Sequence, residues 1–371
     1  AQAVLSRVCW TGRTQSWPSL FPPAHWTFEV GKMGVESSLP VTAKESGSGS
    51  APEGGLAWGS SCMQGWRESM EDAHFAVSSL GGRLEGVAAF GVFDGHGGGA
   101  VSALCRERLP AELANGTNKD DSSALVAAFE KIDRLLASGE TPGLTRDGAH
   151  LCGCTATVCL VRPEAFVVAN AGDCRAVLCR EGVAVPLSED HKPGLPRELE
   201  RIKAAGGFVQ EQEVGPIKVH RVNGGLSCSR AIGDLAYKAN ARLKPCEQMV
   251  CSTPDVKEVA REELGDEFLI LACDGVWDVM SSQDAVDFVR ARIGSGQPLS
   301  GIADDLLDRC LSPNLQWTYG LGGDNMTVMI VALNLADVDT PATTAGTPTP
   351  SESEEACPET SPAPLEGEAK A

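Results

Sequence analysis

Residues 84–100, LEGVAAFGVFDGHGGGA, contain a short apolar run that stops at an aspartate. The run from Val87 to Phe93 is rich in β-branched and aromatic residues and is followed closely by glycine, so it predicts a buried β-strand. A helical spacing of apolar residues begins after the glycines. Asp94 and His96 are therefore expected at the end of a strand, where a rigid scaffold meets solvent. This position suits chemistry better than it suits stability.

The composition limits the kinds of protein this chain can be. Its 371 residues suffice for one large domain or two small ones, and no apolar run approaches the roughly 20 residues that cross a bilayer. The formal net charge of −19 argues against binding nucleic acid as the main activity. Fourteen cysteines spread over this length, without a CxxC pair, favour free thiols in a reducing compartment. We therefore expect a cytoplasmic or nuclear protein without a transmembrane segment.

The first residues differ in composition from the rest. Residues 1–32 are basic with a single acid, which fits an organellar transit peptide or an upstream leader that the native protein lacks. Met33 then opens MGVESS, which matches a myristoylation motif with Gly34 as the acceptor. Coincidence is the alternative for so short a motif. A myristoylated Gly34 would attach the protein to a membrane only weakly.

Two further segments have the composition of unfolded chain. KESGSGSAPEGG at 44–55 predicts a flexible linker, so we assign residues 1–56 to a flexible N-terminal extension. Residues 335–371 are acidic and rich in Pro, Ser and Thr, which predicts a disordered tail. The folded domain is therefore expected at 57–334.

Within the expected domain, apolar periodicity predicts both strands and helices. Strands are expected at 58–63, 73–80, 87–93, 267–274 and 326–333, and helices at 101–109, 125–136, 196–205, 284–293 and 302–311. GCTATVCLV, EAFVVANAG and CRAVLCREG, between 153 and 187, read as three strands with short turns. Strands this close in sequence are expected to form antiparallel hairpins. Residues 223–234 are expected to form a structured loop.

Acidic residues recur at the ends of the expected strands. Asp94 and Asp274 each close an apolar strand, Asp324 lies just before another, and Glu71 and Asp72 lie in a turn between two strands. An aspartate at a strand end is commonly a turn former or a cap. Three of them beside glycine or asparagine are harder to explain in that way.

Carboxylates that converge repel one another unless cations lie between them. Oxygen ligands alone select a hard ion such as Mg²⁺ or Mn²⁺, and two such ions about 4 Å apart can activate a water for in-line attack on phosphorus. A phosphate substrate also needs a fixed fork of donors, for which Arg67 is the candidate. His96 could protonate the leaving oxygen. The alternative for His96 is a purely structural hydrogen bond.

A dinucleotide-binding motif can be rejected. Gly95–Ala100 fits G-x-G-x-x-A after a strand and before a helix. However, Asp94 would face the pyrophosphate, and a second helix follows where a parallel strand should come.

Eight motifs in order resemble the metal-dependent serine/threonine protein phosphatases of type 2C, the PPM family, over roughly residues 57–334. They are MQGWRESMEDAH (63–74), VFDGHGGG (92–99), NAGDCRAVLCR (170–180), EDHKP (189–193), ERIKAAGG (200–207), RVNGGLSCSRAIGD (221–234), LACDGVWDVM (271–280) and GGDNMTV (322–328). So many ordered motifs exceed what a single short motif would support.

The resemblance implies an α+β fold, a four-layer α/β/β/α sandwich of two antiparallel sheets flanked by helices. It implies a phosphatase that hydrolyses phosphoserine and phosphothreonine in protein substrates in one step, without a phosphoenzyme. Two Mg²⁺ or Mn²⁺ ions per subunit are implied at one end of the sandwich. Residues 191–234 resemble the variable flap region that influences substrate choice. We expect a monomer.

Site residues follow from the resemblance, position by position. Asp94 resembles the catalytic carboxylate that bridges both metal ions, and Gly95 the residue that gives a carbonyl ligand. The remaining metal positions are matched by Asp274 and Asp324, which would complete one ion's ligands, and by Glu71 and Asp72, which would act largely through metal-bound waters.

Other positions are implied for substrate and support. Arg67 would grip the phosphate, and His96 would be the general acid. Asp173 and Asp278 match a weaker third metal position seen in some members. Asn325 would support the metal ligands from behind.

Two other functions would use the same residues differently. A pseudophosphatase scaffold that binds phosphoproteins or regulators is disfavoured, because every metal carboxylate and Arg67 are present. A structural cation-binding protein would leave Arg67 and His96 unexplained.

Overall fold

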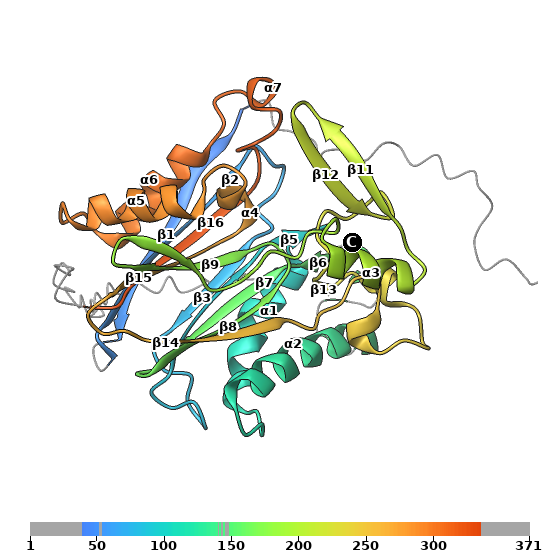
Figure 1. Ribbon diagram of the computed structural model, residues 1–371, viewed down its shortest axis with the longest axis horizontal. Coiled ribbons are helices and arrows are strands. Elements are labelled where there is room, and N and C mark those ends of the chain that lie inside the picture. The colour runs from blue at the N-terminus through green and yellow to red at the C-terminus, as the bar shows by residue number, and fades with distance from the viewer. Residues whose placement is uncertain (1–38, 52–53, 140, 142–143, 145–147, 335–371) are drawn as a thin grey trace, which may run out of the picture. The chain divides into compact units, whose positions relative to one another are not determined.

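The computed structural model describes residues 39–51, 54–139, 141, 144 and 148–334. Two antiparallel β-sheets pack face to face, with helices on both outer faces (Figure 1). Helices α1 (Ala100–Ala114) and α2 (Asp121–Ser138) cover one sheet, and α4 (Asp274–Trp277), α5 (Ser282–Ile293) and α6 (Leu299–Cys310) cover the other. The predicted four-layer α+β fold is therefore confirmed.

The larger sheet has six strands in the order β1-β2-β16-β15-β9-β10. They span Val41–Ala51, Leu56–Gly65, Met326–Ala332, Asp266–Ala272, Arg175–Arg180 and Val183–Pro186. The second sheet has the order β14-β8-β7-β4-β3. Its strands span Asp255–Ala260, Ala165–Ala171, Ala156–Val161, Ala88–Phe93 and Ala73–Val77.

Smaller elements lie around the two sheets. Three short strands form a sheet in the order β13-β6-β5, and β11 pairs with β12 in a hairpin. These strands span Ile232–Gly233, Gly153–Cys154, Gly95–His96, Val209–Val214 and Ile217–Val222. The remaining helices are α3 (Pro196–Ala204), α7 (Leu315–Thr318) and 3₁₀ turns at Leu235–Lys238 and Pro245–Glu247.

The strand before Asp94 is apolar throughout because both of its faces are covered. All six residues of β4 are buried. Phe90 lies in the core between the sheets, where its ring packs edge-on against the ring of Trp58 with 5.6 Å between the ring centroids. Phe93 points the other way, into the core beneath α1 and α2. A strand covered on both sides has a continuous apolar run rather than an alternating one.

The structure corrects the prediction of a flexible linker at 44–55. Most of this segment belongs to β1, which pairs antiparallel with β2. Gly49 serves packing, because a Cβ on it would lie 2.3 Å from the ring of Trp58. Composition alone indicated flexibility, whereas pairing along the backbone and the cover of an aromatic ring order the segment.

The structure also corrects the expected run of hairpins between 153 and 187. Strands β7 and β8 do form a hairpin, but β8 and β9 lie in different sheets. The chain crosses between the sheets at residues 172–174. Gly172 adopts a φ of 118° there, and a Cβ on it would lie 2.4 Å from Thr155 Cβ. Asp173 therefore lies at a crossing between the sheets and not in a hairpin turn.

The remaining helix and strand predictions agree with the structure to within a few residues. The strands β14, β11 and β12, which are rich in charged residues, were not predicted. Gly34 and the tail at 335–371 lie outside the described residues, so the predictions for them are not tested. No helix in the described ranges combines the length and apolar character that a membrane span requires.

A buried ionic network fixes the segment that follows β9 and β10. Arg230 Nη2 lies 2.7 Å from Glu198 Oε1 on α3, and Arg230 Nη1 lies 2.8 Å from Asp255 Oδ1 on β14. Ser229 Oγ also donates to Glu198, at 2.7 Å. Burial raises the pKa of Glu198, but the hydrogen bonds and charges of Arg230 and Arg201 outweigh it and lower the pKa to about 2.

This network predicts a pH-dependent stability. The folded pKa of Glu198, about 2, lies below its ordinary value of 4.5. The contribution of ionised Glu198 to the free energy of unfolding is therefore complete above about pH 4.5 and is lost as the pH falls towards 2. We expect Glu198→Gln to lower the free energy of unfolding by roughly 3 kcal/mol at pH 7, a deficit that shrinks in acid.

Urea unfolding between pH 3 and 7 measures the difference. Glu213→Gln is the control, because that side chain is 74% exposed. A deficit for Glu198→Gln that stays constant from pH 7 to 3 would contradict the assignment.

Candidate active site

Strand ends from both sheets meet at one pocket. Asp94 follows β4, Asp274 follows β15 and opens α4, and Asp324 precedes β16. Nine of the residues predicted from the sequence line this pocket: Arg67, Glu71, Asp94, Gly95, His96, Asp173, Asp274, Asp324 and Asn325. The chain therefore gathers carboxylates that lie up to about 250 residues apart in sequence.

Burial and neighbouring charge both affect the ionisation of these carboxylates. Removal from bulk water raises the pKa of Asp94 well above its ordinary value, and the charges of Asp274, Asp72 and Asp324 raise it further. Burial likewise raises the pKa of Asp274, and Asp324 adds to that increase. Asp94 and Asp274 therefore resist ionisation because they are buried and, in addition, because acidic side chains lie near them.

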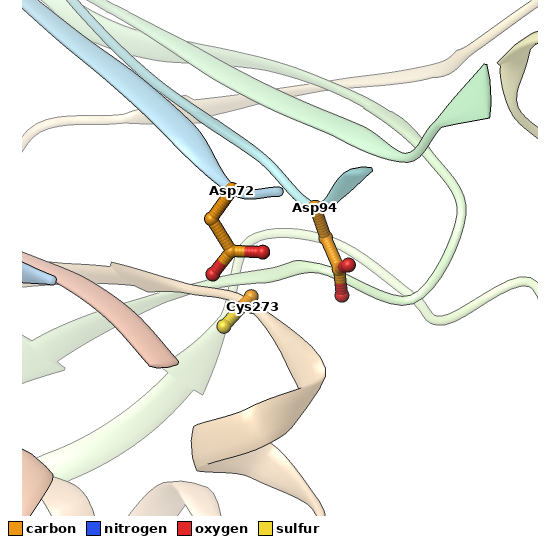
Figure 2. Close-up of side chains that lie close together, drawn as sticks. All are labelled: Asp72, Asp94 and Cys273. Atoms are coloured by element: carbon orange, nitrogen blue, oxygen red, sulfur yellow. The ribbon is translucent and has the colours of Figure 1, made fainter. Parts of the chain in front are cut away.

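Asp72 lies beside Asp94 and Cys273, as Figure 2 shows. The potential ligand atoms of these three side chains all lie within 4.8 Å of one another. Asp72 Oδ2 accepts a hydrogen bond from Thr327 at 2.7 Å, but the buried Oδ1 has no partner among the described residues. Burial raises the pKa of Asp72 to about 7. A buried carboxylate oxygen without a donor fits a bound cation.

Asn325 holds the turn that carries Glu71. The Asn325 side chain accepts from the Glu71 backbone N–H at 2.8 Å and donates to the carbonyls of Gln64 and Ser69, at 2.8 and 3.0 Å. These three hydrogen bonds tie the turn between β2 and β3 to the start of β16.

Gly95 is a position of close approach. A Cβ there would lie 2.1 Å from the carbonyl oxygen of Glu71. Only glycine allows the end of β4 to lie against this turn, which brings Asp94 towards Asp72.

Arg67 lies at the pocket rim and is 44% exposed. Its Nη2 donates to Asp324 Oδ2 at 2.5 Å. The guanidinium therefore combines an anchoring contact with access to solvent.

His96 has a partner that the sequence did not predict. His96 Nε2 lies 2.6 Å from Asp234 Oδ2. Burial lowers the pKa of His96, but the charge of Asp234 and its hydrogen bond outweigh this effect and raise the pKa. Asp234 ends the segment predicted only as a structured loop. Its Gly-Asp sequence was the available signal.

Asp173 and Asp278 share an ammonium group. Lys192 Nζ lies 2.6 Å from Asp173 Oδ2 and 3.9 Å from Asp278 Oδ1. Asp173 is 3% exposed, whereas Asp278 is half exposed. Lys192 was not singled out from the sequence.

The chain resembles known proteins over most of its length. It matches the family model described as Protein phosphatase 2C over residues 56–316. It is 44% identical over 310 residues to Protein phosphatase 2C homolog 3 of Schizosaccharomyces pombe, a match that covers 81% of this chain and 70% of that protein. It is 39% identical over 343 residues to Probable protein phosphatase 2C 58 of Oryza sativa subsp. japonica, covering 81% and 89%.

A solved structure supports the same relationship. The crystal structure of a phosphatase from a pathogenic strain of Toxoplasma gondii matches with a TM-score of 0.64 at 25% identity, covering 81% of this chain and 98% of that one. Fold and matches together define a hydrolase of the phosphatase class. The chain belongs to the protein phosphatase 2C family.

The crowded carboxylates predict an unusual effect on stability. Without divalent ions, Asp94→Asn removes one of several mutually repelling charges, so it should raise the midpoint of thermal unfolding by about 2 °C or more. Adding Mn²⁺ should raise the wild-type midpoint more than that of the variant.

Differential scanning calorimetry with EDTA and then with Mn²⁺ measures both effects. Asp308→Asn serves as the control, because Asp308 is 57% exposed and pairs with Lys44. A metal-free Asp94→Asn protein less stable than wild type would contradict the expected repulsion.

Proposed function

We propose that this chain hydrolyses phosphoserine and phosphothreonine in proteins at a binuclear Mg²⁺ or Mn²⁺ site. The observation that carries the proposal is the group of carboxylates in the pocket, with the unpartnered oxygen of Asp72 beside Asp94. Such oxygen donors suit hard divalent ions. Family membership supports the phosphatase activity.

The proposed ligands are the acids gathered at the strand ends. Asp94 would bridge two ions, with the Gly95 carbonyl as a further ligand. Asp274 and Asp324 would complete the ligands of one ion. Glu71 and Asp72, in the turn, would complete the ligands of the other ion, largely through water. Activation of water for attack on phosphorus, with neutralisation of phosphoryl charge, is the chemistry that such ions supply.

Arg67 is proposed to bind the substrate phosphate. A guanidinium presents a planar fork of N–H donors that matches two phosphoryl oxygens. Its contact with Asp324 holds the side chain at the pocket rim, and its exposure leaves donors for the substrate. The phosphate would therefore be oriented before water attacks it.

His96 is proposed as the general acid. It lines the pocket beside Asp94 and Gly95, and its ring is 26% exposed. When His96 gives a proton to the serine or threonine oxygen, the product leaves as a neutral alcohol and not as an alkoxide, which is a poor leaving group.

Several properties stay predictions from the sequence alone. They are the monomeric state, the cytoplasmic or nuclear location and the myristoylation of Gly34. Basic phosphoproteins are the expected substrates, given the net charge of −19.

The activity test uses a phosphothreonine peptide with Mn²⁺ or with EDTA. We expect Asp94→Asn and Asp274→Asn each to lower kcat by more than about 100-fold, because each removes a proposed metal ligand. Asp308→Asn is the control expected to keep wild-type activity. Hydrolysis that survives EDTA, or that survives both substitutions, would exclude this mechanism. A wild-type protein that binds phosphopeptide without hydrolysing it would be the alternative pseudophosphatase scaffold.

The third metal position can be tested through Lys192. Its ammonium already neutralises Asp173 and Asp278, so a third cation must compete with it. We expect Lys192→Met to add a Mn²⁺ site, or to tighten the weak one about tenfold, since a bound charge no longer has to be displaced.

Isothermal titration calorimetry with Mn²⁺ measures this directly. Lys44→Met is the matched control, because Lys44 pairs with Asp308 on α6 instead. An unchanged number and affinity of Mn²⁺ sites in Lys192→Met would rule out this competition.

A further inference from the structure

We propose that Asp234 is a positioning residue that sets the orientation of His96 for proton donation. The inference rests on the proposed phosphatase function and names a further residue of that site. Asp234 lies 138 residues from His96 in sequence and is not among the residues that line the pocket.

The contact between the two side chains is close and shielded. His96 Nε2 lies 2.6 Å from Asp234 Oδ2, and the Asp234 side chain is only 2% exposed. The carboxylate accepts the hydrogen of Nε2, which fixes where the ring hydrogens lie. Nδ1 is then the ring nitrogen left to exchange a proton with substrate in the pocket.

The sheet β13-β6-β5 is built to hold this pair. In its register, Gly153 is opposite His96 on one side and opposite Gly233 on the other. A Cβ on Gly153 would lie 2.3 Å from Asp234 Oδ2 and 2.8 Å from His96 Nε2. Gly153 therefore leaves the space that the pair of side chains occupies.

The backbone of Asp234 is held in a conformation that non-glycine residues seldom adopt. Its φ is 52°, and its N–H donates to the Cys152 carbonyl at 3.0 Å. The preceding Gly233 donates to Asp133 Oδ1 on α2, at 2.8 Å. Left-handed backbone of this kind persists where the surroundings determine it strongly, and it clusters at functional sites.

The proposed step balances in protons and electrons. As the phosphorus–oxygen bond to the serine or threonine oxygen breaks, that oxygen keeps the bonding electron pair and takes the proton from His96 Nδ1. The ring becomes neutral and keeps its Nε2 hydrogen on Asp234. The product leaves as a neutral alcohol. With Asn at 234, the amide N–H₂ can replace the accepting oxygen, so the ring orientation is no longer fixed.

The kinetic test compares two substrates with different leaving groups. p-Nitrophenolate leaves with little help from a proton, whereas the threonine oxygen of a phosphopeptide needs one. We expect Asp234→Asn and Gly153→Ala to lower kcat about 10- to 100-fold for the phosphopeptide and less than about threefold for p-nitrophenyl phosphate. In a His96→Asn background, adding Asp234→Asn should not lower kcat for the phosphopeptide any further.

Asp133→Ala is the control for a merely structural role. It removes the carboxylate that accepts hydrogen bonds from the Gly233 N–H and from Lys238 Nζ, and it leaves the His96–Asp234 contact in place, so it should slow both substrates by the same factor. An equal loss of both substrates in Asp234→Asn, or a further loss in the His96→Asn background, would overturn the inference.

A second measurement does not depend on activity. Nitrogen-15 NMR of the histidine rings, with His96 assigned from the His96→Asn spectrum, should show the neutral ring carrying hydrogen on Nε2 in wild type and a mixed state in Asp234→Asn. An unchanged ring in the variant would refute positioning by Asp234. A wild-type protein that lacks phosphatase activity would refute the proposed function, and this spectrum would still decide the role of Asp234.

Discussion

The site depends on electrostatic repulsion between carboxylates that lie together at one end of the β-sandwich. Burial raises the pKa of Asp94, Asp274 and Asp72, and the charge of the neighbouring Asp324 raises the pKa of each of them further. Such crowding of carboxylates costs stability unless positive charge lies among them. Arg67 and Lys192 supply part of that charge at the edges of the group. The unpartnered oxygen of Asp72 lies within the group and has no donor in the described part of the chain.

The two sheets make this arrangement possible. β4 comes from one sheet and β15 and β16 from the other, and packing between the sheets brings their ends to one pocket. Glycines allow close approaches in the site, at Gly95 against Glu71 and at Gly153 beside His96 and Asp234. The apolar core thus provides the rigidity, and the strand ends provide the chemistry.

Much of the site could be predicted from sequence because its signals are local. A carboxylate that ends or directly precedes an apolar run, beside glycine or asparagine, marks Asp94, Asp274 and Asp324 without any structure. Asp234 follows a glycine but no long apolar run, and Lys192 carries no local signal, because the importance of both lies in contacts with residues far away in sequence. The strand β1 was missed for the same reason, because its Gly49 packs against the ring of Trp58 on the neighbouring strand β2.

The most direct test of the central claim is anomalous diffraction from crystals of the protein grown with Mn²⁺, recorded on both sides of the manganese absorption edge. We predict two anomalous peaks among Asp94, Asp274, Asp324 and the turn of Glu71 and Asp72. Crystals saturated with Mn²⁺ that show no peak there, with the carboxylates paired to protein groups instead, would contradict it.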